Sequence, residues 1–208
     1  MEVIAIIPAK GHSTRCLDKN TRDFAGEPLF LKSVHYAIEE GFMPLVASED
    51  EDILRLARRE GVPTFSEAPH PDAPMEYLIN QILQKIPRIK RFSILQPSSP
   101  LRRRGLLREM MSSIGDYGCF TAQKIKLVGL LNGKIYRNDL RKTDDKYFWL
   151  FDGNILCRNA DEYRKNPCLL TEGMKVFEEE IPYYFQIDYE KEFKLLNLLE
   201  KHRKDYEL

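Results

Sequence analysis

Short apolar runs and helical stripes alternate through the first half of the chain. The apolar runs predict buried strands at residues 3–7, 43–47, 62–65 and 92–96. Apolar residues at helical spacing predict helices at residues 29–39, 75–86 and 102–114, and in the segment that ends at Gly61. Ser48 and Glu51 have the spacing of a capping box for that segment. Four strand–helix repeats imply parallel strands with helices on both faces of the sheet.

The second half of the chain is less regular. Strands are predicted at residues 118–125, 134–137 and 151–157, the last of them interrupted by Gly153. A final helix carries Phe193, Leu196 and Leu199 on its inward face. The sequence has no internal repeat and no obvious linker, so residues 1–208 are expected to form one domain. The expected fold class is α/β: a three-layer αβα, Rossmann-like domain with a mostly parallel mixed sheet.

Composition and charge remove several classes of protein from consideration. The chain has 32 lysines and arginines against 32 aspartates and glutamates, so no global field attracts nucleic acid or an anionic membrane. The N-terminal apolar run is too short to span a bilayer or to act as a secretion signal. Four cysteines without paired spacing and four scattered histidines provide no zinc signature. Free thiols without a signal peptide predict a cytoplasmic protein.

The loop after the first strand has the composition of an anion-binding loop. Pro8 ends the strand, and residues 10–19 then combine one glycine, two hydroxyl side chains and three cations. An ordinary surface loop with solvated lysines is the alternative at this point. The glycine fingerprints of dinucleotide sites and phosphate loops are absent, which disfavours an NAD(P)-dependent reductase. Ligands of such sheets bind at the carboxyl ends of strands, so residues 8–20 and 96–102 are expected to share one site.

Four stretches in register across nearly the whole chain carry a resemblance to a known family. Residues 6–13 (I-I-P-A-K-G-H-S) with Lys19 and Asn20 are similar to the family's I-P-A-R-G-G-S-K-x-x-x-x-K-N. The other three are A-G-E-P-L at 25–29, L-Q-P-S-S-P-L-R at 95–102 and Q-I-D-Y-E-K-E-F at 186–193. They resemble x-G-K-P-L, L-Q-P-T-S-P-L-R and D-I-D-T-x-x-D-[FL] of the acylneuraminate cytidylyltransferases, also called CMP-sialic acid synthetases. A weaker match lies at residues 141–145 and 149–153.

The resemblance implies a nucleotidyltransferase domain with a defined reaction. CMP would pass from CTP to the anomeric hydroxyl of a nonulosonic acid, with Mg²⁺ present and pyrophosphate released. A carboxylate sugar must then approach a triphosphate, so cations are needed to offset the repulsion. The resemblance also implies a homodimer, in which an excursion around residues 125–150 projects into the neighbouring copy.

Matched position by position, the resemblance implies site residues in three groups. Lys19 and Asp188 would be catalytic, and Asp188 would also hold the metal. Nucleotide binding is implied for Lys10, Gly11, Ser13 and Asn20, and substrate binding for Gln96, Ser98, Arg141 and Lys142. The position of Asp188 before the last helix also predicts that it is the N-cap of that helix, and the N-cap and metal-binding roles can coexist. Arg141 and Lys142 have a solvated charge run as their alternative.

Several positions depart from the family's pattern. Gln186 replaces a metal-linked aspartate, so the metal site loses one charge. Lys10 replaces an arginine and loses its bidentate fork. His12 replaces a glycine, and a positive φ there would require a locally different loop. The alternatives are therefore a nucleotidyltransferase for another sugar or sugar acid, a different nucleotide, and a catalytically weak nucleotide-sugar-binding relative.

Overall fold

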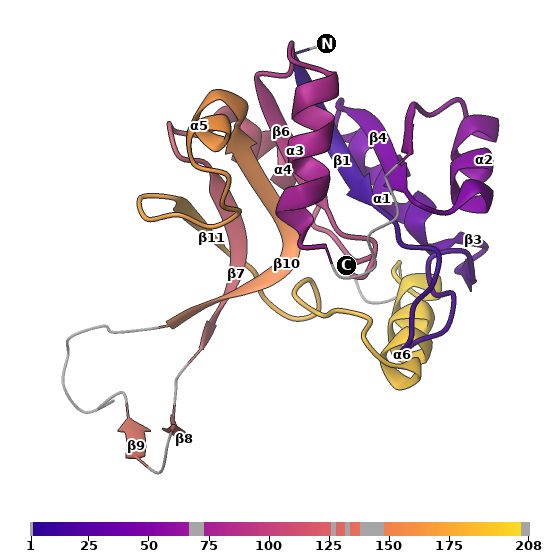
Figure 1. Cartoon of the computed structure of the whole chain (residues 1–208). Coiled ribbons are helices and arrows are strands. Elements are labelled where there is room, and N and C mark those ends of the chain that lie inside the picture. The colour runs from indigo at the N-terminus through magenta and orange to yellow at the C-terminus, as the bar shows by residue number, and fades with distance from the viewer. Residues whose placement is uncertain (1, 67–72, 126–127, 132–133, 138–147, 205–208) are drawn as a thin grey trace.

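A seven-stranded sheet lies between two layers of helices (Figure 1). The computed structural model describes residues 2–66, 73–125, 128–131, 134–137 and 148–204. In spatial order the strands are β11 (Lys175–Glu178), β7 (Cys119–Ile125), β10 (Phe148–Asn159), β6 (Arg91–Leu95), β1 (Val3–Pro8), β4 (Met43–Ser48) and β5 (Thr64–Ser66). β10 is antiparallel to both of its neighbours, and the other pairs are parallel. The predicted mostly parallel mixed sheet is confirmed.

The side chains of β1 show why helices cover both faces. Successive side chains of a strand point to opposite faces. Ile4 and Ile6 lie in one apolar cluster, and Ala5 and Ile7 lie in another. The first cluster includes residues of α3 (Met75–Lys85) and α5 (Ala160–Lys165), and the second includes residues of α1 (Leu29–Glu39), α2 (Glu51–Arg59) and α4 (Leu106–Ser112). A strand that is apolar at every position is thus buried on both sides.

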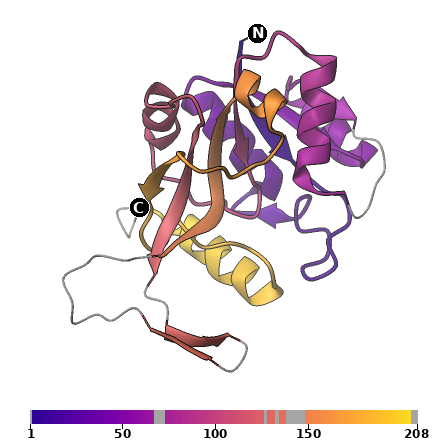
Figure 2. The same ribbon diagram turned by 60° about the vertical axis from the view of Figure 1, so that its left-hand side comes forward.

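A third apolar cluster lies below the carboxyl ends of the parallel strands. Helix α6 (Glu190–Lys201) buries Phe193 and Leu196 there, against Phe24 and Ile187. The two-stranded sheet of β2 (Asp23–Phe24) and β3 (Glu27–Pro28) belongs to the same region. The last helix therefore packs against the segment that follows β1, and Figures 1 and 2 show it at that end of the sheet.

The second half of the chain contributes β10, which carries an irregularity, and a projecting pair of strands. The register between β10 and β7 shifts between Phe151 and Leu156, where Gly153 has a φ of 71°. The predicted strand broken at Gly153 is therefore confirmed, although it extends further at both ends. β8 (Val128–Leu131) and β9 (Lys134–Arg137) form a separate sheet that lies away from the main one (Figures 1 and 2).

Two local predictions were wrong. The helix predicted from residue 102 begins at Leu106, because the side chain of Arg102 turns inward and Gly105 takes a φ of 82°. The capping box that Ser48 and Glu51 predicted for α2 (Glu51–Arg59) was also wrong. Its N-cap is Asp50, whose carboxylate accepts hydrogen bonds from the amides of Asp52 and Ile53. Helix α5 and strand β11 were not predicted. Among the described helices, none is long and apolar enough to cross a membrane.

Candidate active site

A cavity of about 790 Å³ opens at the carboxyl ends of β1, β4 and β6. Its lining comes from the loop after β1, the residue after β4, the start of α3, the loop after β6 and the segment before α6. Seven residues predicted from the sequence lie in it: Lys10, Ser13, Lys19, Asn20, Gln96, Ser98 and Asp188. The two predicted loops therefore do share one site, as the position of ligands in such sheets suggested.

The loop after β1 is packed closely against the turn after β4. The Gly11 amide donates a hydrogen bond to Glu49 Oε1 at 2.9 Å. A Cβ atom on Gly11 would lie 2.5 Å from the Cβ of Asp50, so the close approach of the Asp50 side chain to the loop backbone requires glycine. The side chain of Asn20 is buried, and its Nδ2 donates to the carbonyl of Lys10 at 2.8 Å. Asn20 therefore shapes the loop by joining its two ends.

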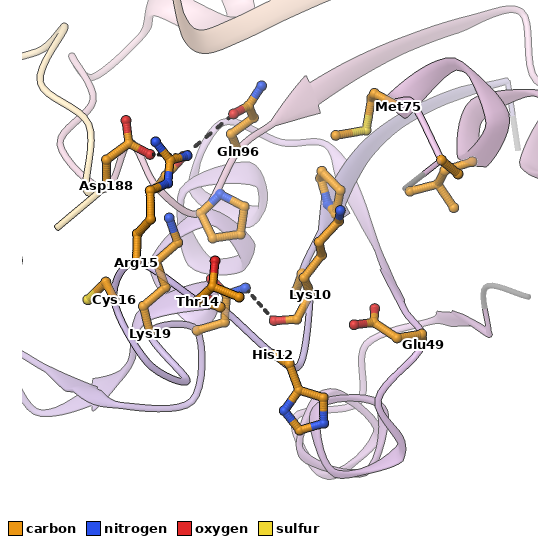
Figure 3. Close-up of a pocket in the computed structure, with 18 of the residues that line it drawn as sticks. Lys10, His12, Thr14, Arg15, Cys16, Lys19, Glu49, Met75, Gln96 and Asp188 are labelled. Atoms are coloured by element: carbon orange, nitrogen blue, oxygen red, sulfur yellow. Dashed lines mark hydrogen bonds and ion pairs between the residues drawn. The ribbon is translucent and has the colours of Figure 1, made fainter. Parts of the chain in front are cut away.

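His12 is turned away from the other labelled residues of the loop (Figure 3). Its side chain is 90% exposed, and its Nδ1 lies 3.7 Å from Asp18 Oδ1. Asp18 and Ala25 are the non-glycine residues with positive φ in the described part of the chain. The backbone at His12 therefore does not need glycine.

The ammonium group of Lys19 is fixed by a hydrogen bond to the main chain. Its Nζ donates to the carbonyl of Ile187 at 2.6 Å. Burial lowers the pKa of Lys19, and the nearby carboxylate of Asp188 opposes that shift. Figure 3 shows Lys10 and Lys19 extending in the same direction from their loop. Two ammonium groups on one side of a cavity suit a ligand that carries several negative charges.

Ion pairs connect the same loop to the start of α6. Arg15 Nη2 lies 3.0 Å from Asp188 Oδ1. Arg22 binds Glu190 through two parallel hydrogen bonds, of 2.7 and 2.9 Å. Together with the bond from Lys19 to the Ile187 carbonyl, these contacts join the N-terminal loop to the segment before α6 and to the first residue of that helix.

The loop after β6 completes the wall of the cavity. Ser98 Oγ donates to Gln96 Oε1 at 3.5 Å, and the Ser98 carbonyl accepts a 2.7 Å hydrogen bond from the Ile187 amide. Arg102 anchors this loop from below: its side chain donates to the Gln96 carbonyl at 2.7 Å and to Ser33 Oγ at 3.0 Å. Arg102 is 2% exposed, and burial lowers its pKa to about 10.

Asp188 does not cap the last helix. The carboxylate of Glu192 accepts hydrogen bonds from the amides of Asp188 and Tyr189, and Tyr189 occupies the N-cap position. The cap interpretation of Asp188 was therefore wrong. Its own carboxylate stays 39% exposed and faces the cavity, paired with Arg15.

The residues present are compatible with one Mg²⁺ ion. Among the described residues, no group of three or more histidines, cysteines, aspartates or glutamates is arranged to hold a metal. Mg²⁺ is commonly held by one or two carboxylates together with water and substrate phosphates, which Asp188 can satisfy. Gln186 lies against Gly153, where a Cβ atom would come within 2.4 Å of its Nε2. Gln186 is also absent from the cavity lining.

Some of the lining was not predicted, and part of the prediction falls outside the described residues. Arg15 and Glu49 line the cavity; Arg15 was counted only among the three cations of the loop, and Glu49 was assigned no role from the sequence. The signal for Glu49 was its place directly after a parallel strand, which the capping-box interpretation of its neighbours obscured. Arg141 and Lys142 lie outside the residues that the structure describes.

Several solved structures share this architecture. No protein-family profile matches the chain. CMP:2-keto-3-deoxy-manno-octonic acid synthetase in complex with CTP aligns with a TM-score of 0.72 over 100% of both chains, at 15% identity. 4-Diphosphocytidyl-2C-methyl-D-erythritol synthase from Anaerococcus prevotii aligns with a TM-score of 0.70, over 96% of this chain and 98% of that one, at 12% identity. The chain therefore has the nucleotidyltransferase fold.

Sequence comparison narrows the similarity to cytidylyltransferases. Pseudaminic acid cytidylyltransferase from Campylobacter jejuni is 38% identical over 63 residues, which are 29% of this chain and 27% of that protein. N-acylneuraminate cytidylyltransferase from Streptococcus agalactiae is 23% identical over 214 residues, which are 93% of this chain and 52% of that protein. The chain thus spans about half the length of the streptococcal relative. The similarity to acylneuraminate cytidylyltransferases inferred from the four motifs is confirmed.

Proposed function

We propose that this protein transfers CMP from CTP to a sialic-acid-like nonulosonic acid and releases pyrophosphate. One observation carries the proposal: Lys10, Arg15 and Lys19 line one cavity with Asp188 at the carboxyl edge of the sheet, and Arg15 pairs with the carboxylate of Asp188. Three cations in one place suit a triphosphate and a sugar carboxylate better than a neutral ligand. The names of the curated relatives support a cytidine nucleotide and an acidic sugar.

In this proposal the loop after β1 holds the triphosphate. Lys10, Ser13 and the Gly11 segment contact its phosphates, and Lys19 balances the charge that develops on the departing pyrophosphate. The anomeric hydroxyl oxygen attacks the α-phosphorus, and the bond from that phosphorus to the oxygen bridging to the β-phosphorus breaks. Asp188 accepts the hydroxyl proton. Gln96 and Ser98 orient the sugar beside the nucleotide.

Mg²⁺ and a second copy of the chain are further parts of the proposal. Asp188 would hold Mg²⁺, and the ion would neutralise phosphate charge. A homodimer formed through the excursion around residues 125–150 would add residues to the sugar site, and Arg141 and Lys142 are the candidates. A reducing cytosol is the proposed location, and the four cysteines are unpaired.

The test is pyrophosphate release with Mg²⁺, each of the four nucleoside triphosphates and a panel of sialic, legionaminic, pseudaminic and deoxy-octulosonic acids. Release with CTP and one nonulosonic acid, lost in Lys19→Met, is the expected result. Arg55→Gln, on an exposed face of α2, serves as the matched control. Release with CTP and the octulosonic acid alone would change the substrate but keep the reaction. No release with any pair would contradict the proposal.

A catalytically weak nucleotide-sugar-binding protein is the second candidate, because Gln186 stands at a metal-linked aspartate position and contacts Gly153. Gln186→Asp separates the two candidates. A large gain of turnover from almost none would favour the weak relative. Turnover in the wild type that Gln186→Asp leaves unchanged or lowers would favour the enzyme.

A further inference from the structure

The ion pair between Arg15 and Asp188 lies at the mouth of the cavity. Arg15 Nη2 and Asp188 Oδ1 are 3.0 Å apart, and the two side chains are 60% and 39% exposed. Both residues line the cavity. The Arg15 guanidinium also lies 5.7 Å from the ring centroid of Tyr189. An incoming ligand therefore reaches both charged groups without opening the apolar core.

The carboxylates of the described cavity lining are already engaged. They belong to Glu49 and Asp188. Glu49 accepts the Gly11 amide, a contact that holds the loop in place. Asp188 remains as the carboxylate that a divalent cation can reach, and Arg15 is bound to it. A guanidinium and a divalent cation cannot share one carboxylate at full strength, because the two positive charges repel each other.

We propose that Arg15 competes with the divalent cation for Asp188 and moves to the phosphates when a metal-bound triphosphate enters. The proposal rests on the proposed function for the identity of the ligand. Arg15 belongs to the same loop as Lys10 and Lys19, so phosphates held by those lysines lie within its surroundings. Its planar guanidinium suits phosphate oxygens in a bidentate arrangement. Before binding, Asp188 pairs with Arg15 and the triphosphate pairs with the cation. After binding, Asp188 pairs with the cation and the triphosphate pairs with Arg15.

This exchange couples the metal to the nucleotide. A cation that binds without nucleotide must displace Arg15 from Asp188, and it costs free energy to leave that guanidinium without an anion. A triphosphate that binds without a cation has a second cost, because Arg15 is still paired with Asp188 and must be withdrawn from it. When the two ligands arrive together, both costs disappear, so each should raise the affinity for the other by the same factor.

Removing the guanidinium should therefore change two affinities in opposite directions. Arg15→Gln frees Asp188, and the affinity for the bare cation should rise about two- to fivefold, as expected for the loss of an exposed ion pair. The same variant loses a charged contact to the triphosphate, and the affinity for metal-bound CTP should fall about tenfold. A purely structural role for Arg15 would lower both affinities.

The experiment measures free Mn²⁺ by electron paramagnetic resonance, without nucleotide and then with CTP. Calorimetry measures CTP binding with and without Mg²⁺. The variants are Arg15→Gln, Arg15→Lys and Asp188→Asn. Arg22→Gln is the matched control, because Arg22 lies in the same loop and pairs with Glu190 outside the cavity lining. Thermal melts confirm that each variant is folded.

The expected result is tighter Mn²⁺ binding in Arg15→Gln, lost binding in Asp188→Asn, and wild-type Mn²⁺ binding in Arg22→Gln. Arg15→Lys should lie between the wild type and Arg15→Gln. Unchanged or weaker Mn²⁺ binding in Arg15→Gln would overturn the proposal, as would no detectable Mn²⁺ binding in either protein. Failure of the proposed function appears differently, as absent turnover with every sugar acid, and leaves the Mn²⁺ comparison as a valid test.

Discussion

The loops after β1 and β6 lie at the same edge of the sheet but are held in different ways. The loop after β1 is tied to distant residues through half-exposed ionic contacts, such as Arg15 with Asp188 and Arg22 with Glu190. The loop after β6 is tied through Arg102, which is 2% exposed and donates to main-chain and hydroxyl oxygens. A ligand can replace the partners in the ionic contacts of the first loop, whereas the contacts that Arg102 makes with the second loop are buried.

This difference separates binding from stability within one site. Exposed ion pairs contribute little to folding, because water and salt screen them. A buried hydrogen-bonded charge contributes strongly, since its removal leaves other polar atoms without partners. Substitutions in the first loop should therefore change ligand binding and turnover, whereas substitutions beneath the second should change the free energy of unfolding.

The largest effect on stability is expected from Arg102→Ala. The carbonyl of Gln96 and the hydroxyl of Ser33 lose their donor inside the protein. We expect a loss of about 3–5 kcal/mol in the free energy of unfolding, measured by urea denaturation. Arg104→Ala is the control, since Arg104 is exposed and should change stability by less than about 0.5 kcal/mol. Equal urea midpoints for the two variants would remove the distinction between the loops.

Lys19→Met should show the converse behaviour. Its kcat/KM for the proposed reaction should fall about 10²–10³-fold, in the range seen when one charge-stabilising donor is removed. The melting temperature should change little in comparison with Arg102→Ala. Lys10→Met should lose less activity, because Lys10 has no described contact that fixes its ammonium group. A larger loss in Lys10→Met than in Lys19→Met would reverse these roles.

Alkaline pH should reveal the same lysine. The pKa of Lys19 is lowered by burial, so Lys19 loses its proton at a lower pH than an ordinary lysine. The activity of the wild type should therefore fall with rising pH below the usual titration range of lysine. The pH profile of kcat/KM measures this, and Lys10→Met should keep the same alkaline limb. Loss of the alkaline limb in Lys10→Met would show that Lys10, and not Lys19, causes it.

A smaller effect is expected from Glu179, which lies beside the second loop with Oε1 3.6 Å from Arg103 Nε. Burial raises its pKa to about 7, and Asp152 adds to the shift while Arg103 opposes it. A carboxyl with a raised pKa in the folded state stabilises the protein below its unfolded pKa, and that contribution is lost as the pH rises through 7.

Glu179→Gln should therefore flatten the dependence of stability on pH and raise the free energy of unfolding at pH 8 by about 1–3 kcal/mol. Glu178→Gln is the control, because Glu178 is the neighbouring exposed carboxylate on the same strand. Denaturation at pH 5 and pH 8 provides the measurement. Parallel pH profiles for the wild type and Glu179→Gln would show that Glu179 does not titrate in this range.

The smallest effect concerns the pair of Arg22 and Glu190. A double-mutant cycle with Arg22→Gln and Glu190→Gln should give a coupling far smaller than the effect of Arg102→Ala, since water and salt screen these partly exposed side chains. Thermal or urea unfolding measures it. A coupling as large as the effect of Arg102→Ala would show that the first loop also relies on its contacts for folding.

Much of the fold follows from local patterns, and the exceptions have physical causes. Strands that are apolar at every position and helices with a clear stripe were predicted close to their bounds, as with α1. The start of α4 was misplaced because a helical pattern does not show that the side chain of Arg102 is needed in the core. β11 escaped prediction because it is a short edge strand in which Phe177 is the one buried residue.

The candidate site divides in the same way. Loops that follow parallel strands must lie at one edge, so topology alone brings residues 8–20 and 96–102 together. The partners of the individual side chains depend on tertiary packing. Nothing in the local sequence shows that Arg15 pairs with Asp188, that Glu49 binds the Gly11 amide, or that Gln186 contacts Gly153.

The contacts between the first loop and the start of α6 also decide how late in its synthesis the chain can bind a ligand in the cavity. A chain is synthesised from its N-terminus, and its early segments begin to fold before the later ones exist. Lys19 and Arg22 bind residues that follow them by 168 positions. Until the ribosome has released those residues, the cations of the loop have neither their carboxylates nor a closed cavity. The strands of the first half can pair early, but ligand binding must wait until the α6 segment has emerged.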